Sequence, residues 1–501
     1  MKKIFVVFGI IFLYSFLFIA CDPEPSGVDV VLRRATTSLV HPGILHTQEE
    51  FMAMRKLIDR WEGIGRDYTA FDGVTWNVPP QVPVGPPSDR EMTPQEFVES
   101  QGGRFFDRPE NSPICPNAIA EYREYRAQRR RMFAEYRAWR SYRDFITHPA
   151  GSLAPWTERR FEFIGRCGPV SGTKTPVEQD FQRAYFNAVR WVLTGDRRHA
   201  QLAFFILDSY ARHLVGFQHA GMYDFMLMVG LQGHLYAATA EILRFARCTV
   251  YNQDSGFIPE QFHNIDRSIR NIWLRHVIRD YIELPPWRAG NQGTMIQAAY
   301  IAMAIYLDDP ALFDHAIDFL VNAYSEANIK HYIHHVSGQV GEATRTQGYV
   351  MLALSKIGMS ADMAWRQGVD VWGSHNNTLW RASEFASRYN MGDNNITTTT
   401  MLVFDPFSPV FFFDNTWDYQ RFGYGWELTQ MNRGYPFKGG ELFYNHFVRR
   451  RGKQMPWTEA WLPLPGDPTF SDFWAVDDSP PGFVSFLGVP LELSRELGLW
   501  Q

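Results

Sequence analysis

The stretch that decides the fold is "VEQDFQRAYFNAVRWVLT" (177–194), which Gly195-Asp196 separates from "RHAQLAFFILDSYARHLV" (198–215). Both segments place apolar residues at i, i+3, i+4 and i+7, the pattern of an amphipathic helix. The short connection predicts that the two helices pack side by side and antiparallel. The same pattern recurs downstream, with short connections, and predicts helices at 222–247, 262–281, 294–307, 311–324, 343–357 and 360–370.

A long series of paired helices with almost no period-two alternation predicts an all-α fold: a bundle, a solenoid or a closed α/α toroid. No repeat of fixed length is visible. Residues after about 395 are rich in β-branched and aromatic residues, Pro and Gly. They predict a cap of loops and short strands over one end of the helical body. No linker separates this cap, so 41–501 is expected to be one domain.

The N-terminus, "MKKIFVVFGIIFLYSFLFIAC", resembles a bacterial lipoprotein signal. It implies cleavage after residue 20, a lipid on Cys21, and a tether over 21–40. We therefore expect an exported protein, lipid-anchored in the cell envelope at the periplasm or the outer-membrane surface. A simple signal peptide or a membrane helix is the alternative. No later segment approaches the ~18 apolar residues that span a bilayer.

The composition limits the kinds of molecule that the protein is expected to bind. The formal net charge of −5 provides no global basic field, so no nucleic acid partner is expected. Cys115, Cys167 and Cys248 form no CxxC or Cys/His cluster, which argues against zinc. We expect no cofactor and no catalytic metal. A monomer that contacts membrane only through its lipid is the simplest expectation.

Two polar stretches stand out against the apolar helices. In "GNQG" (290–293), Asn291 and Gln292 precede a long apolar helix, so Asn291 could cap it and the helix N-terminus could receive a carboxylate. An ordinary turn with an N-cap is the structural alternative. In "GEATRTQGYV" (341–350), Glu342, Arg345 and Tyr349 have i, i+3, i+7 spacing and share one face if the helix begins at Glu342.

That second stretch can carry acid–base chemistry. A guanidinium beside a phenol stabilises the phenolate, and Glu342 can hold Arg345 in place. Alternatively, Arg345 can clamp a substrate carboxylate. An exposed Glu–Arg pair beside a half-buried Tyr is the structural alternative. Histidines offer further acid–base candidates, at His234, in "HYIHH" (331–335) and at His446. No GxSxG or GxxxxGK motif is present, and no carboxylate pair can be placed across one glycosidic bond.

Five pieces, in order along residues 41–460, resemble the alginate-lyase family of polysaccharide lyases. They are "HPGILHT" (41–47), "DFQRAYFNAVRWVLTGD" (180–196), "GNQGTMIQAAYIAMAIYLDD" (290–309), "SGQVGEATRTQGYVMLALSKIG" through "MAWRQGVDVWGSHNNTLWRASEFASRYNMGDN" (337–394), and "YNHFVRRRGKQMPWT" (444–458). The resemblance implies an incomplete α/α toroid and an enzyme that cleaves uronic-acid polysaccharide, of alginate (polymannuronate) or glucuronan type, by β-elimination. The product would carry a C4–C5 unsaturated uronate end.

The resemblance also implies roles for individual residues. Tyr349 would be the base and acid, with Arg345, Asn291 and His234 as its catalytic partners. The residues expected to bind the anionic polysaccharide are Gln292, Glu342, Gln347, Trp287, His446 and Asn445. Relatives commonly have Asp where this chain has Thr346 and His where it has Tyr349, and some have His in place of Gln292. The alternatives are a toroid hydrolase acting on uronate oligosaccharides and a non-catalytic glycan-binding lipoprotein.

Overall fold

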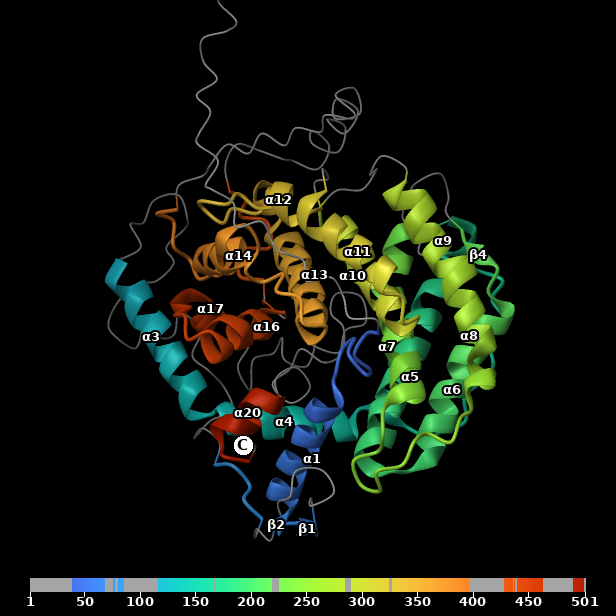
Figure 1. Cartoon of the computed structure of the whole chain (residues 1–501). Helices are drawn as coiled ribbons and strands as arrows, with labels where there is room; N and C mark the ends of the chain where they lie inside the picture. The colour runs from blue at the N-terminus through green and yellow to red at the C-terminus, as the bar shows by residue number, and fades with distance from the viewer. Residues whose placement is uncertain are drawn as a thin grey trace, which may run out of the picture.

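Helices account for most of the chain that the computed structural model describes (Figure 1). The described residues are 38–67, 75–76, 80–84, 116–165, 168–218, 225–283, 290–323, 327–396, 428–435, 437, 439–462 and 490–499. The signal 1–20, Cys21, most of the tether, Cys115, Cys167 and Trp287 lie outside these ranges, and their assignments stay predictions. None of the described helices is long and apolar enough to cross a bilayer.

The longer helices are α1 (Gln48–Glu62), α3 (Pro116–Met132), α4 (Ala134–Thr147), α5 (Lys174–Thr194), α6 (Arg197–His213), α7 (Phe225–Phe245), α10 (Asn291–Tyr306), α11 (Pro310–Asn322), α13 (Gln347–Arg366) and α14 (Ser374–Asn390). A bent helix follows α7 and comprises α8 (His263–Ser268), η4 (Ile269–Trp273), α9 (Leu274–Val277) and η5 (Ile278–Ile282), of which η4 and η5 are π-helical.

Shorter elements complete the described chain. They are η1 (Pro149–Gly151), η2 (Gly168–Thr173), η3 (Pro259–Phe262), α12 (Ile329–Tyr332), η6 (Gly341–Thr344), α16 (Gly440–Tyr444), the π-helical η7 (Asn445–Arg450), α17 (Pro456–Trp461) and α20 (Pro490–Glu496). Strand β1 (Arg66–Asp67) pairs antiparallel with β2 (Thr75–Trp76), and β3 (Phe163–Ile164) pairs parallel with β4 (Gly216–Phe217). The described part of the C-terminal region is therefore built from α16, η7, α17 and α20.

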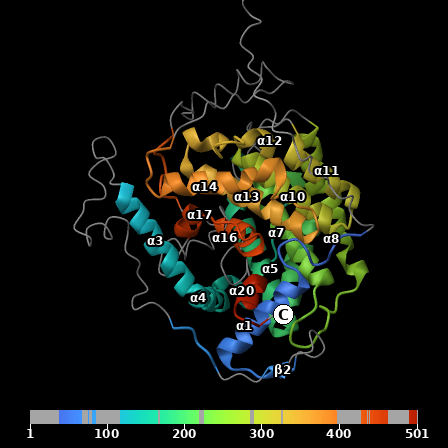
Figure 2. The same cartoon turned by 60° about the vertical axis from the view of Figure 1, so that its left-hand side comes forward.

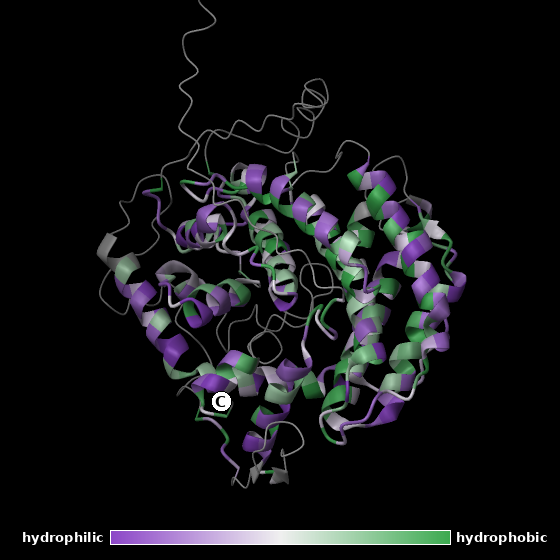
Figure 3. Ribbon diagram, in the orientation of Figure 1, coloured by the Kyte–Doolittle hydropathy of each residue, from purple (hydrophilic) through white to green (hydrophobic). Residues whose placement is uncertain are grey.

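The helices form an open ring in two layers (Figures 1 and 2). Helices α5, α7, α10 and α13 pack in succession, while α6 packs on α5 and α11 packs on α10 from outside. Helix α10 is buried along nearly its whole length, and its ribbon is largely green and white in Figure 3, whereas α6 and α8 alternate green with purple. The all-α, incomplete α/α-toroid prediction is confirmed.

Contacts between α7 and α10 show that neighbouring inner helices run in the same direction. A Cβ on Gly230 would lie 2.7 Å from Met295, and one on Gly233 would lie 2.5 Å from Met303. Residue numbers thus rise together along both helices, and the two glycines allow the backbones to approach closely. An α/α toroid has this arrangement because each outer helix returns the chain to the start of the next inner helix. The N-terminal ends of the inner helices therefore collect at one end of the ring.

The stretch "HPGILHT" anchors the start of the helical body to α7. The carboxylate of Glu241 is buried, and it accepts hydrogen bonds from the backbone N–H groups of Gly43 and Ile44, each at 2.9 Å. His41 Nδ1 lies 2.9 Å from the same carboxylate. A buried carboxylate is tolerated here because these donors satisfy it.

The expected break between helices at 343–357 and 360–370 was wrong. Helix α13 begins later, at Gln347, and continues through Gly358 to Arg366. A glycine inside a helix costs about 1 kcal/mol relative to Ala, but the neighbouring Ile357 and Met359 are both buried. The burial of these two side chains outweighs the low helix propensity of Gly358, which had favoured a break there.

Two arginines of α3 are buried against the C-terminal helices. Arg126 of α3 is buried and donates to the carbonyls of Ala460 and Leu462, at the end of α17. Arg130 is also buried and lies 2.7 Å from the carboxylate of Glu441. These arginines therefore fasten α3 to the C-terminal helices.

Glu441 sits among three guanidiniums, and replacing it provides a test of acid stability. Burial alone would raise the pKa of Glu441, but Arg130, Arg137 and Arg449 outweigh burial and lower it to about 2. This stabilisation is present above the unfolded pKa near 4.5 and is lost as pH falls from there through about 2.

We therefore expect Glu441→Gln to lower the free energy of unfolding by roughly 3 kcal/mol at pH 7, and by progressively less below pH ~4.5. Urea unfolding of both proteins at pH 7, 4 and 3 measures this difference. A constant difference across the three pH values would show that the lost stability is unrelated to the charge of Glu441.

Candidate functional site

A buried carboxylate, Glu342 of η6, lies at the N-terminal end of α10 and is saturated with hydrogen bonds. Its Oε1 accepts from Asn291 Nδ2 at 2.8 Å and from Arg345 Nη1 at 2.9 Å. Its Oε2 accepts from the backbone N–H of Asn291 at 2.8 Å and from the hydroxyl of Tyr332 at 2.7 Å. Glu342 therefore joins the starts of α10 and α13 to the end of α12.

Gly290 makes this close approach possible. Its φ of 65° and ψ of −140° suit glycine, and a Cβ there would lie 2.6 Å from the Glu342 carboxyl carbon. The N-cap of α10 is Gly290, so the prediction that Asn291 caps this helix was wrong. The partial positive charge of the helix N-terminus is met by the protein's own carboxylate.

Arg345 connects this buried carboxylate to an exposed phenol. Its guanidinium carbon lies 4.6 Å from the ring centroid of Tyr349, a cation–π distance. The side chain of Arg345 is 16% exposed, that of Glu342 is 2% exposed, and Tyr349 is 39% exposed. The three residues thus run from the interior to solvent. They do not lie on one helix as expected, because Glu342 belongs to a 3-10 turn that precedes α13.

Gln347 lies beside these residues, and its amide is engaged within the protein. Its Nε2 donates to the carbonyl of Ala343 at 2.9 Å, and its Oε1 accepts from Asn390 at 3.1 Å. Its backbone N–H donates to the carbonyl of Met431 at 3.0 Å. Gln347 therefore ties α13 to α14 and to the segment 428–435.

Gln292 is the next residue along α10, and its Oε1 is buried without a hydrogen-bond partner. An unpaired buried acceptor is costly, so this amide is suited to receiving a donor from a bound molecule. Unlike Asn291, Gln292 does not donate a hydrogen bond to Glu342 within the described residues. Gln292 therefore has capacity left for a ligand at the start of α10; the Oε1 of Gln297 is also unpaired but lies farther along the same helix.

His234 is buried in α7, where its Nδ1 lies 3.1 Å from the carbonyl oxygen of Gly230. Burial, and then the positive charge of Lys356, hold the pKa of His234 well below its ordinary value. Its Nε2 has no hydrogen-bond partner. No hydrogen bond joins His234 to the Glu342 group within the described ranges, and its catalytic role stays a prediction.

The structure does not bring His446 to the Glu342 group. The His446 ring stacks on Trp372, with centroids 5.0 Å apart, and meets Trp365 edge-on at 4.9 Å. Trp365 follows Tyr349 by sixteen residues on α13, about 24 Å along the helix axis. Burial, and then Arg450, lower the pKa of His446 to about 3. Asn445 is also buried, with both amide atoms unpaired.

Sequence reasoning missed Tyr332, although it lies between the histidines of "HYIHH". Its hydroxyl is one of the four donors to Glu342, and its ring is buried. A tyrosine in a polar stretch carries no specific signal of such a role. In the part of the chain that the structure describes, no group of three or more His, Cys, Asp or Glu side chains could hold a metal ion.

Comparisons with known proteins bear on this site. The family model "Alginate lyase" matches residues 171–396. The search of curated proteins gives no match. Among solved structures, alginate lyase A1-III from Sphingomonas species A1 is 14% identical, with 66% of this chain and 92% of that chain covered and a TM-score of 0.41.

An alginate lyase from Bacteroides ovatus is 11% identical, with 71% of this chain and 97% of that chain covered and a TM-score of 0.43. A variant of alginate lyase A1-III complexed with a tetrasaccharide is 15% identical, with coverages of 62% and 86% and a TM-score of 0.41. Asn291, Glu342, Arg345 and Tyr349 all lie within the residues that the family model matches.

Proposed function

Since this chain belongs, through residues 171–396, to the alginate lyase family of polysaccharide lyases, we propose that it cleaves a uronic-acid-containing polysaccharide by β-elimination. The substrate would be an alginate (polymannuronate) or a glucuronan-like polymer. The product would carry a C4–C5 unsaturated uronate at its new non-reducing end.

One observation carries this proposal: an exposed phenol, Tyr349, lies against a guanidinium, Arg345, that a buried carboxylate holds in place. A solvent-facing phenol can reach a polymer, whereas the Glu342 carboxylate below it cannot. Holding the guanidinium by Glu342 fixes its position before substrate arrives, which lowers the ordering cost of binding. The arrangement suits proton transfer beside a bound anion.

In the proposed reaction, Arg345 binds the uronate carboxylate and makes the C5 proton acidic, while the unpaired Oε1 of Gln292 accepts a hydrogen bond from a hydroxyl of the same sugar. Tyr349, as phenolate, removes that proton and then delivers it to O4 of the leaving sugar. The C5–H and C4–O4 bonds break, the C4–C5 double bond forms, and Tyr349 returns to its starting state. Electrostatic stabilisation of the enolate-like intermediate by Arg345 supplies the larger share of the rate, with acid–base catalysis adding to it.

Asn291 acts one step away from the substrate in this scheme. Its backbone N–H and its side-chain amide both donate to Glu342, so its main contribution is to position that carboxylate. Gln292 lies at the same helix end, and its unpaired oxygen can accept from a substrate hydroxyl.

Ultraviolet absorbance tests the reaction class. The mature protein would be incubated with polymannuronate, polyguluronate and glucuronan, and absorbance of the C4–C5 double bond would be followed. We expect absorbance to rise with at least one polymer. New reducing ends without absorbance would indicate a hydrolase, and binding without either product would indicate a glycan-binding protein.

Arg345→Ala is expected to lower kcat/KM with a raised KM. The change removes the guanidinium that contacts Tyr349 and leaves Glu342 buried without its charged partner. Steady-state kinetics on the preferred polymer measure both constants. Arg345→Lys should recover charge but not the planar fork, and so should rescue only part of the activity. Unchanged constants for Arg345→Ala would reduce this residue to a structural ion-pair partner.

We further propose that the protein is exported and held in the cell envelope by a lipid on Cys21. Residues 21–40 would form the tether, and the end of this segment contacts the helical body at residue 39, where the Leu39 N–H donates to Asp308 at 2.8 Å. Mass spectrometry of the membrane fraction tests this: the expected N-terminus is a lipid-modified Cys21, and an unmodified N-terminus elsewhere would contradict it.

A further inference from the structure

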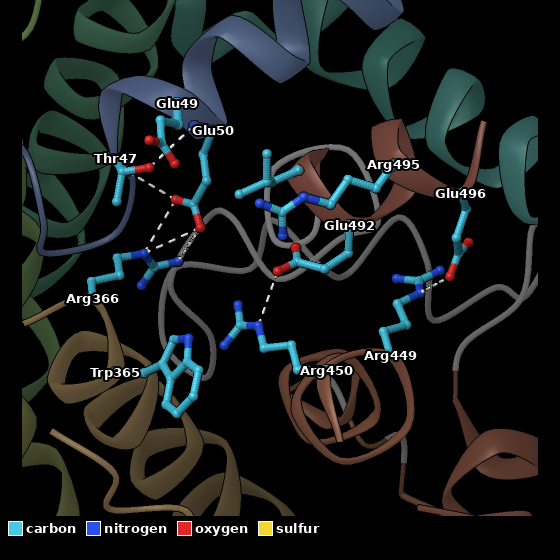
Figure 4. Close-up of a pocket in the computed structure, with 11 residues that line it drawn as sticks. Thr47, Glu49, Glu50, Trp365, Arg366, Arg449, Arg450, Glu492, Arg495 and Glu496 are labelled. Atoms are coloured by element: carbon cyan, nitrogen blue, oxygen red, sulfur yellow. Dashed lines mark hydrogen bonds and ion pairs between the residues drawn. The ribbon is translucent and has the colours of Figure 1, made fainter. Parts of the chain in front are cut away.

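A pocket of about 590 Å³ lies at the far end of α13 from Tyr349 (Figure 4). Its walls come from the start of α1, the end of α13, η7 and α20. The distance from Tyr349 to Trp365 along the helix is about 24 Å, so this pocket is separate from the Glu342 group. Its volume falls in the range typical of small-molecule sites.

Most charges around the pocket are already neutralised by neighbours. Three arginines hold three glutamates in ion pairs, each between 2.8 and 3.1 Å: Arg366 with Glu50, Arg450 with Glu492, and Arg449 with Glu496. Arg495 differs, because it is exposed and its guanidinium has no hydrogen bond or ion pair within the described residues. A guanidinium in this state can receive a carboxylate from a ligand.

Glu492, by contrast, needs a hydrogen-bond donor. This residue is only 7% exposed. Its Oε1 accepts from Arg450 at 2.9 Å, whereas its Oε2 is buried and has no hydrogen-bond partner. An unpaired buried carboxylate oxygen is unfavourable unless a donor reaches it. In Figure 4 this carboxylate lies between Arg450 and the side chain of Arg495 in the view shown. A ligand hydroxyl near that oxygen would satisfy it.

Trp365 supplies a third group that could contact a ligand. Figure 4 shows its indole nitrogen directed toward the pocket, and that N–H has no acceptor within the described residues. The pocket thus offers a free guanidinium for a carboxylate, a carboxylate oxygen for a hydroxyl, and an indole N–H for a ring or hydroxyl oxygen. A sugar acid presents these three groups together.

We propose that this pocket binds the terminal uronate residue of an acidic oligosaccharide, as a second carbohydrate site that is not catalytic. The choice of a uronate rests on the proposed function. One acidic residue fits better than a run of them, because the lining arginines and glutamates are equal in number and Glu49 faces the pocket without an ion pair in the described chain.

Calorimetric titration with a mannuronate trisaccharide tests the proposal, using the full mature chain carrying Tyr349→Phe so that no cleavage occurs. We expect two trisaccharides bound per chain. Adding Arg495→Ala should weaken one of the two by at least about tenfold, and adding Glu492→Gln should weaken the same one. Arg495 is exposed, so its replacement should leave the fold intact, and Arg198→Ala, at an exposed arginine paired with Asp196, is the matched control.

The outcomes separate this site from the catalytic one. If Arg495→Ala and Glu492→Gln both leave the titration unchanged, the second site is wrong. If a neutral cellulose trisaccharide binds there equally well, the assignment to an acidic sugar is wrong. Should Arg345→Ala remove no binding while Arg495→Ala does, the second site stands and the proposed function fails. In otherwise unaltered enzyme, Arg495→Ala should leave kcat on short oligosaccharides unchanged.

Discussion

Tyr349→Phe is expected to abolish elimination while leaving binding and folding intact. The phenol oxygen would be both base and acid, and positioned acid–base groups contribute typically ~10²–10⁴-fold to a rate. Phe retains the ring against which Arg345 packs at 4.6 Å, and the Tyr349 hydroxyl has no hydrogen-bond partner within the described residues. Turnover, followed by ultraviolet absorbance, should fall by at least about 10²-fold.

The matched control is Tyr251→Phe, at a tyrosine that is 62% exposed and packs near Gly195, outside the Glu342 group. It should keep full activity. Thermal unfolding and calorimetric binding should be unchanged for both variants. Near-normal turnover by Tyr349→Phe would show that another group removes the C5 proton, with His234 as the next residue to replace.

Glu342→Gln is expected to have the largest combined effect on stability and activity. The carboxylate accepts four hydrogen bonds, and an amide of the same shape can accept at only one of its two ends. Arg345 also loses its counter-charge. Removing one partner of a buried ion pair costs roughly 3–5 kcal/mol, and the starts of α10 and α13 lose their shared anchor.

Urea unfolding measures the stability loss, and ultraviolet absorbance at a temperature where the variant is folded measures the activity loss. Glu124→Gln is the control, because the Glu124–Arg131 pair is half exposed and should contribute no more than about 1 kcal/mol. Tyr332→Phe removes a single donor to Glu342 and should cost about 1 kcal/mol. If Glu342→Gln loses no more stability and activity than Glu124→Gln does, the Glu342 carboxylate does not organise the site.

Local patterns predicted much of the helical architecture. The periodicity of 177–194 and 198–215 corresponds to α5 and α6 within a few residues, because apolar spacing at 3.6 residues directly reflects which face is buried. The pairing of Arg345 with Glu342 was also predictable, since residues three apart stay close in both 3-10 and α conformations. Grouping "GNQG" with the Tyr349 stretch came from the family resemblance.

Other features depend on contacts that no local pattern encodes. The helix that continues through Gly358 depends on the burial of Ile357 and Met359. His446 looked like a site residue because of its fragment, yet Trp365 and Trp372 enclose its ring at the other end of α13. No sequence pattern indicated a role for Tyr332, because its contact with Glu342 depends on how α12 packs.

Residue patterns predicted paired helices and an all-α fold, because burial periodicity is a local property. The family resemblance added the ring and the short list of residues that would handle a uronate. Long-range contacts determine which of those residues are enclosed and which reach solvent. Glu342, fifty-one residues after Asn291, takes the donors at the α10 N-terminus, since parallel inner helices bring their first turns together. In the proposed reaction, that buried contact leaves Arg345, Gln292 and Tyr349 to meet the polymer.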